Sequence, residues 1–197
     1  MSKNREDQEI FFVNPDYRTI IPIRKFHFSK SLKRLIKQRP FQITFNKAFP
    51  QVIDACANIN RNQTWINKEI ESLFISLHKM QYAHSIECWK DNKLVGGIYG
   101  LAIGGVFFAE SMFSSVSNGS KIALSILVAM LWKTGFKLLD VQFLNEHLLQ
   151  FGAHEITKHQ FKSKLDLALE IEADLYSIGL TDNDLFECLS LLVHSNI

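Results

Sequence analysis

Residues 84–113 read HSIECWKDNKLVGGIYGLAIGGVFFAESMF, and this stretch decides the fold class. It contains three apolar runs that are rich in the β-branched and aromatic residues typical of strands. The runs are 84–90, 93–101 and 105–113. Asp91-Asn92 separates the first two runs and Gly104-Gly105 the last two, and such pairs are typical of tight turns. We therefore expect three consecutive strands joined by short turns.

On both sides of these strands, apolar residues recur at helical spacing. The expected helices span 29–38, 49–59, 64–77, 120–134, 145–151, 158–178 and 182–194. Further strands are expected at 20–28, 41–46 and 138–143. Thr64 is expected to cap the third helix, and residues 1–9 are expected to be mobile. This mixed order of elements, without an internal repeat, predicts an α+β fold.

The composition is that of a globular protein with a sizeable core. The 197 residues are 47% hydrophobic and carry a formal net charge of only +2, so any affinity for nucleic acid must come from a local patch. Three widely spaced cysteines without a C-x-x-C pair indicate reduced thiols in a cytoplasmic protein. Every apolar stretch is interrupted before the roughly 18 residues of a membrane span, so no membrane association is predicted.

Two carboxylates lie inside apolar runs. Glu110 follows Phe107-Phe108-Ala109, and Asp140 lies within the expected strand at 138–143. Burying an ionisable group without a partner costs several kcal/mol, which makes both positions candidates for a functional site. Asp140 and Gln142 are two residues apart and would project from the same face of a strand. Spacing alone leaves a structural role open, with Asp140 ending the strand and Glu110 paired with a lysine.

The remaining motifs predict no metal or cofactor. Gly96-Gly97 and Gly104-Gly105 lie in strand-like sequence rather than before a helix, which favours a bent strand approached closely by another segment. The three histidines between residues 147 and 159 are too irregularly spaced for a zinc site. Residues 117–121 precede a helix, and they could hold a phosphate or simply cap that helix.

Five sequence words occur together in an order and at a spacing that resemble one family. They are Tyr82-Ala-His-Ser-Ile-Glu-Cys-Trp89, Leu94-Val-Gly-Gly-Ile-Tyr-Gly100, Glu110-Ser-Met-Phe-Ser114, Asn118-Gly-Ser-Lys121 and Asp140-Val-Gln142. From about residue 12 to about residue 161, the chain resembles the bacterial leucyl/phenylalanyl-tRNA–protein transferases. The resemblance implies a GNAT-like mixed sheet flanked by helices. It also implies a reduced N-terminal annex at 1–46 and an acyltransferase domain at 47–197.

The implied reaction transfers Leu or Phe, with Met left open, from aminoacyl-tRNA to the α-amino group of a protein beginning with Arg or Lys. This tags the protein for degradation by the N-end rule. The acyl ester is already activated, so positioning the substrates suffices and no cofactor is expected. By resemblance, Asp140 orients Gln142, which binds the attacking amine. Glu110 faces the basic N-terminal residue of the acceptor, and Trp65 and Asn145 form the walls around the peptide.

The resemblance places the aminoacyl pocket on one apolar helix and the strands beside it. The pocket residues are Ile98, Leu124, Leu127, Leu131 and Leu139. Considered without the resemblance, leucines at this helical spacing are typical of a core. Family members often have Met at position 98 and Phe at positions 127 and 131, so the pocket here is expected to be smaller and aliphatic.

Positive charge is densest between residues 30 and 39. The cluster could be a solvated helix face or a surface that contacts phosphates and weakens with salt. The resemblance favours tRNA binding by Lys33, Arg34, Lys37 and Arg39. The expected partners are aminoacyl-tRNA and acceptor proteins with a basic N-terminal residue, and the protein is expected to be a monomer.

The chain departs from the family pattern near its N-terminus, and two alternative functions also stay open. The family words G-G-D-L and G-I-F-P-W are absent, and residues 12–18 replace a tryptophan-rich stretch, which affects the acceptor side most. One alternative is an acyl-CoA-dependent GNAT N-acyltransferase, although the loop at 114–120 has a single glycine and no arginine for a pyrophosphate. The other is a non-catalytic module that binds tRNA or protein.

Overall fold

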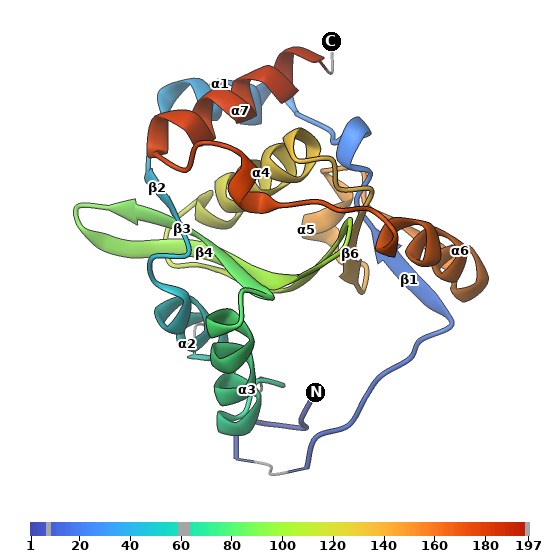
Figure 1. Ribbon diagram of the computed structural model, residues 1–197. Helices are drawn as coiled ribbons and strands as arrows, with labels where there is room; N and C mark the ends of the chain where they lie inside the picture. Colours follow the sequence, from blue (N-terminus) through green and yellow to red (C-terminus); the bar gives the residue numbers. More distant parts are fainter. Residues whose placement is uncertain (7–8, 59–63, 196–197) are drawn as a thin grey trace.

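A seven-stranded sheet forms the centre of the computed structural model, which describes residues 1–6, 9–58 and 64–195 (Figure 1). The strands are β1 (Tyr17–Ile20), β2 (Gln42–Phe45), β3 (Ala83–Lys90), β4 (Lys93–Ile103), β5 (Val106–Ser114), β6 (Leu138–Gln142) and β7 (His154–Thr157). Their order is β2-β3-β4-β5-β6-β1-β7, and all neighbours are antiparallel except the parallel pair β5 and β6. The mixed sheet confirms the predicted α+β class.

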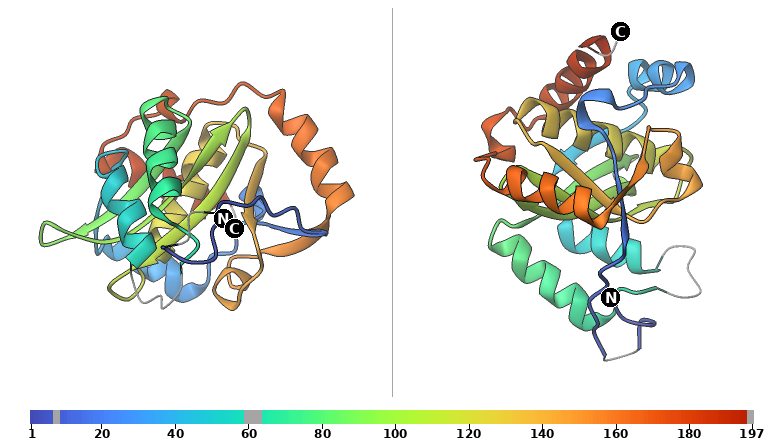
Figure 2. Two further views of the ribbon diagram at one scale, coloured as in Figure 1. Left: turned by 90° about the horizontal axis from the view of Figure 1, so that it is seen from below. Right: turned by 90° about the vertical axis from the view of Figure 1, so that its right-hand side faces the viewer.

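Helices cover both faces of this sheet. They are α1 (Lys30–Gln38), α2 (Phe49–Asn58), α3 (Lys68–Lys79), α4 (Gly119–Lys133), α5 (Glu146–Leu149), α6 (Lys158–Leu169) and α7 (Asp182–Ser195). Helix α4 packs on one face with α1 and α7 beyond it, and α2 and α3 cover the other face (Figures 1 and 2). The α4 face holds the largest apolar cluster, because almost every side chain of that helix is buried.

The predicted strand cluster is confirmed as the hairpins β3–β4 and β4–β5. Asp91 and Asn92 form the first turn with φ angles of 50° and 58°, which a two-residue hairpin turn requires. Gly96 lies where the start of α4 crosses β4, and a Cβ on it would come 2.8 Å from the backbone of Gly119. The expectation that another segment approaches this strand closely is therefore confirmed at Gly96.

Three expected boundaries are wrong. The strand expected at 20–28 ends at Ile20, because a 3-10 turn at Ile23–Lys25 follows Pro22, which has no backbone N–H for a ladder. The cap of α3 is Asn67, whose side chain accepts a hydrogen bond from the N–H of Ile70 at 2.8 Å, and Thr64 lies outside the helix. The helix expected at 158–178 ends at Leu169.

Two of the N-terminal residues contact the rest of the fold, and the expected mobility of 1–9 stays a prediction; residues 7 and 8 lie outside the described ones. Ser2 is buried, and its hydroxyl donates to the carbonyl oxygen of Trp65 at 2.9 Å. Arg5 forms an ion pair with Glu71 at 3.2 Å. Strands β1 and β2 belong to the central sheet, and the division into an annex and a domain at residue 46 stays a prediction.

Candidate functional site

The site forms where the two parallel strands stop pairing. β5 and β6 pair from Val106 and Leu138 up to Phe108 and Asp140. Glu110 and Gln142 are each two residues beyond the last pair, and both side chains line the same two cavities. The end of strand pairing thus brings together two residues that are 32 positions apart in the sequence.

A β-bulge sets the position of Glu110. In the β4–β5 ladder Tyr99 pairs with Ser111 and Gly100 pairs with Ala109, so Glu110 is the extra residue between the two pairs. A bulge bends its strand and redirects the side chain of the extra residue. Gly100 permits the bulge, because a Cβ at this position would collide with the carbonyl oxygen of Phe108.

Gln142 ends β6 in the left-handed backbone region, with a φ of 58°. Residues other than glycine adopt this region rarely, and here a carboxylate stabilises it. The N–H of Gln142 donates to Oδ1 of Asp140 at 2.9 Å. Asp140 therefore orients the backbone of Gln142, in a geometry different from two side chains projecting from one strand face.

Asp140 is completely buried and pairs with Arg18 of β1. The guanidinium contacts both carboxylate oxygens and lies 4.8 Å from the ring centroid of Phe161. No motif in the sequence assigns a role to Arg18. The signal that could have identified it is the apolar setting of Asp140, because a buried carboxylate requires a cation or several hydrogen bonds.

The inner cavity, about 150 Å³, collects six of the predicted site residues. They are Trp65, Ile98, Glu110, Leu124, Gln142 and Asn145. Met112 and Leu148 also line it, and neither is among the residues expected from the sequence. Asn145 caps α5 by accepting from the N–H of Leu148 at 2.9 Å, which fixes its side chain at the cavity edge.

The other predicted residues of this group lie behind the cavity wall. Leu127 and Leu131 of α4 and Leu139 of β6 are buried in the largest core cluster and are not among the residues that line the inner cavity. Asp140 is likewise buried and does not line the cavity, but it accepts a hydrogen bond from the N–H of Gln142, which does. The assignment of the three leucines to an aminoacyl pocket stays a prediction.

The outer cavity, about 370 Å³, adjoins the inner one and shares Trp65, Glu110 and Gln142 with it. Its walls are mainly apolar and come from residues 10–13 and from α3. This cavity was not expected from the sequence, although the apolar residues 10–13 after a polar start are a signal for it. Two adjoining cavities suit a reaction that joins two substrates.

Burial makes Glu110 a weak acid. Desolvation and then the negative charge of Asp140 raise the pKa of Glu110 to about 7, although Arg18 and the N-terminal ammonium act in the opposite direction. The carboxyl group of Glu110 forms no hydrogen bond or ion pair with another described residue, so the alternative that it pairs internally with a lysine is wrong within the described part of the chain. An incoming cation would therefore meet an unpaired carboxyl group.

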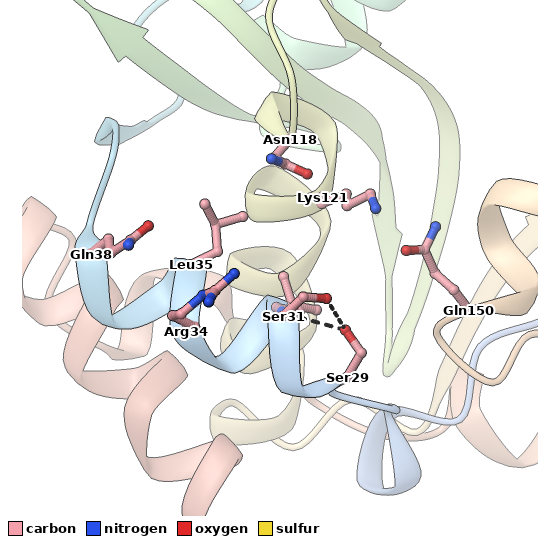
Figure 3. A pocket seen from close by; sticks show the side chains of 9 residues that line it. Ser29, Ser31, Arg34, Leu35, Gln38, Asn118, Lys121 and Gln150 are labelled. Atoms are coloured by element: carbon pink, nitrogen blue, oxygen red, sulfur yellow. Dashed lines mark hydrogen bonds between the residues drawn. The ribbon is translucent and has the colours of Figure 1, made fainter.

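Helix α1 carries three of the four predicted tRNA-binding residues, Lys33, Arg34 and Lys37, on one side of its surface. Arg39 ends α1 and docks on α7, where it donates to Oδ1 of Asn183 at 2.8 Å and lies over the ring of Phe186. Arg34 instead lines a polar cavity beside the start of α4, together with Lys121 (Figure 3). Their part in tRNA binding stays a prediction.

Two kinds of feature are absent from the described residues. These residues contain no group of three or more His, Cys, Asp or Glu side chains placed to hold a metal ion. Within the same ranges, no helix has the length and apolar character needed to cross a membrane.

Comparison with known proteins gives a consistent result. The pattern of the leucyl/phenylalanyl-tRNA protein transferase family matches residues 20–166. The leucyl/phenylalanyl-tRNA–protein transferase of Phenylobacterium zucineum is 47% identical over 181 residues, which are 91% of this chain and 82% of that protein. The enzyme of the same name from Rhodospirillum rubrum is 44% identical over 184 residues, which are 92% of this chain and 86% of that protein.

One solved structure with a distant similarity was also found. The C-terminal domain (DUF2156) of a putative lysylphosphatidylglycerol synthetase from Agrobacterium fabrum aligns with a TM-score of 0.41 and 10% identity. The alignment covers 82% of this chain and 57% of that chain, and at this level it does not assign the fold.

Proposed function

The chain belongs to the leucyl/phenylalanyl-tRNA protein transferase family, and from this we propose that it transfers Leu or Phe from aminoacyl-tRNA to the α-amino group of an acceptor protein. The observation that carries the proposal is the junction of two cavities at Glu110 and Gln142. The inner cavity, with Ile98 and Leu124 in its wall, would take the amino-acid side chain. The outer cavity would take the first residues of the acceptor.

The chemistry requires positioning rather than a nucleophilic side chain. The acceptor nitrogen attacks the carbonyl carbon of the ester, a peptide bond forms, and the bond to the ribose oxygen breaks. Gln142 would accept a hydrogen bond from the attacking amine through its amide oxygen, with its backbone held by Asp140. A neutral amide is too weak a base to take the proton, so the proton passes to water or to the leaving ribose oxygen.

The same site would select the acceptor. Glu110 is a buried carboxyl group without a bound cation among the described residues, at the junction of the cavities. An N-terminal Arg or Lys would supply the missing positive charge and favour the ionised form of the carboxyl group. We assign Trp65 and Asn145 to the walls that hold the acceptor backbone.

The proposal also covers the fold family, the oligomeric state and the cellular location. A GNAT-like assignment is supported by the parallel pair β5 and β6 inside an otherwise antiparallel sheet, with the cavities where this pair separates. We further propose that the protein is a monomer and acts in the cytoplasm, where its aminoacyl-tRNA substrate is made. There it would tag proteins for degradation.

One assay tests the reaction and its alternatives together. Labelled Leu-tRNA is incubated with the protein and a peptide that begins with Arg, beside a control with acetyl-CoA. Transfer of Leu to the peptide amine is the expected result. Acetylation of the peptide would instead support an acyl-CoA-dependent N-acyltransferase, and binding of tRNA without either product would support a non-catalytic module.

A further inference from the structure

A polar cavity of about 160 Å³ lies beside the inner cavity, between α1 and the start of α4. Figure 3 shows Arg34 reaching from α1 and Lys121 from α4, with Gln150 beyond Lys121. The other polar side chains of the lining are Ser29, Ser31, Gln38 and Asn118. The lining contains no acidic residue, so the cavity has two positive charges and several hydrogen-bond donors.

The two cations have no acidic partner within the described ranges of the chain. Neither Arg34 nor Lys121 forms an ion pair there. Burial and then the nearby charge of Lys121 lower the pKa of His147 on α5. Two unneutralised cations that face one small cavity favour an anion with several acceptor oxygens, such as a phosphate.

The spacing to the inner cavity fits a nucleotide substrate. Lys121 and Leu124 line the polar and inner cavities respectively, and they are three residues apart on α4, which is about 4.5 Å along the helix axis. On the other side Leu148 lines the inner cavity, and Gln150 lines the polar one. The polar cavity therefore lies within about one nucleotide of the place where the acyl group would be held.

We propose that Arg34 and Lys121 together bind the phosphate group on the 5′ side of the terminal adenosine of aminoacyl-tRNA. This rests on the proposed function, and it adds Lys121 as a binding residue and assigns one phosphate to the pair. The same cavity chemistry would also accept the pyrophosphate of an acyl-CoA. The substrate source must therefore be one arm of the test.

The experiment uses a short substrate, the trinucleotide CCA aminoacylated with Leu, in two forms. One has the natural phosphate before the terminal adenosine, and the other has a neutral methylphosphonate at that position. Affinities are measured for the wild-type protein, for Lys121→Gln and for Arg34→Gln. Lys90→Gln is the matched control, because Lys90 is exposed on the β3–β4 hairpin and its loss removes the same charge.

The expected result is that removing the phosphate charge and removing one cation weaken binding by less than the sum of their separate effects. Methylphosphonate should weaken binding to the wild type about tenfold, as the loss of a charge-assisted hydrogen bond does. Lys121→Gln should weaken binding of the natural trinucleotide by a similar factor and make the methylphosphonate effect clearly smaller than in the wild type, because only Arg34 then remains to contact the phosphate. Arg34→Gln should show the same pattern, and Lys90→Gln should behave like the wild type with both forms.

Three outcomes would overturn the proposal. One is a methylphosphonate effect that is equally large in Lys121→Gln and in the wild type. Another is a loss of affinity in Lys121→Gln for leucyl-adenosine, which has no phosphate. The third is a loss of acetyl-CoA affinity in Lys121→Gln that is larger than its loss of trinucleotide affinity. If the wild type bound CCA-Leu but transferred nothing to a peptide, the proposed function would fail while the phosphate site stood.

Discussion

Arg18 and Asp140 form an ion pair that joins β1 to β6 across 122 positions of the sequence. Asp140 is completely buried, and its second contact is the backbone N–H of Gln142. One carboxylate thus ties β1 to the residue that would bind the attacking amine. The pair is therefore expected to affect stability as well as catalysis.

Arg18→Met should lower the free energy of unfolding by about 3–5 kcal/mol, because it leaves a buried carboxylate without its cation. Urea denaturation measures this loss. Arg24→Met, which removes an exposed arginine, is the matched control and should change stability little. Equal stabilities of the two variants would show that the pair contributes nothing net to the fold.

Gln142→Ala should lower the transfer rate about tenfold or more, which is roughly 1.4 kcal/mol of activation free energy, because the amine loses its acceptor oxygen. Asp140→Ala should lower the rate to a similar extent, and it should also lower stability because Arg18 loses its partner. Single-turnover transfer and thermal unfolding are measured on both. Normal turnover in both variants would remove the pair from the reaction.

Glu110→Gln keeps the shape of the side chain and removes its charge. With a pKa of about 7, Glu110 changes from mostly neutral at pH 6 to mostly ionised at pH 8, so the KM of a peptide beginning with Arg should fall about tenfold over this range. The acceptor amine titrates nearby, and the Glu110→Gln variant serves as the control because it retains only that second effect. If the KM of the peptide changed with pH equally in both proteins, Glu110 would have no role in acceptor binding.

The effect of Glu110→Gln on stability also has a predictable direction. The folded-state pKa of Glu110 lies above the ordinary value of 4.5, so the folded protein binds the proton more strongly than the unfolded chain does. Stability therefore falls as the pH rises through the window from 4.5 to about 7. Glu110→Gln lacks this loss and should melt at the same or a higher temperature than the wild type at pH 8. A clearly lower melting temperature would indicate an internal partner.

Residues that line the inner cavity should respond to mutation differently from residues buried in the core behind it. Ile98→Ala enlarges the lining and should shift the preference from Leu towards Phe by about 1–3 kcal/mol. Leu127→Phe adds volume to a filled core and should lower the free energy of unfolding by about 1–3 kcal/mol. Competition between Leu-tRNA and Phe-tRNA, with urea denaturation, measures both effects. A changed preference without a stability loss in Leu127→Phe would place Leu127 in the pocket.

The elements that the sequence predicts well have local signals. The hairpin of β3 and β4 follows from apolar, strand-forming residues around Asp91 and Asn92, and α1 follows from Ser29, which caps it, and from its apolar stripe. Strand β7 was missed, because its four residues are mostly exposed and acquire a strand conformation only by pairing with β1. Such non-local pairing leaves no periodic pattern in a short segment.

The site was predicted as a set of residues but without its geometry. Glu110 occurs in an ordinary strand pattern, and nothing in the sequence marks it as the extra residue of a bulge. Gln142 has a positive φ without being Gly, Asn or Asp, because a contact from Asp140 stabilises a conformation that local preference disfavours. The resemblance supplied the identity of both residues, and tertiary pairing determines where they point.

Replacing Lys33, Arg34 and Lys37 together by Gln should weaken aminoacyl-tRNA binding and flatten its dependence on salt. Fewer counterions are released when phosphate contacts are lost, so the slope of log affinity against log salt should shrink by about 2 to 3 if each cation meets one phosphate. Transfer at saturating tRNA should change less, because the cavity residues are intact. The control replaces Lys79, Lys90 and Lys93, which are exposed and carry the same total charge. Equal slopes in the two triple variants would return the α1 cluster to the role of a solvated helix face. Arg39 is left in place because it docks on α7, and its removal would mix a stability effect with the binding effect.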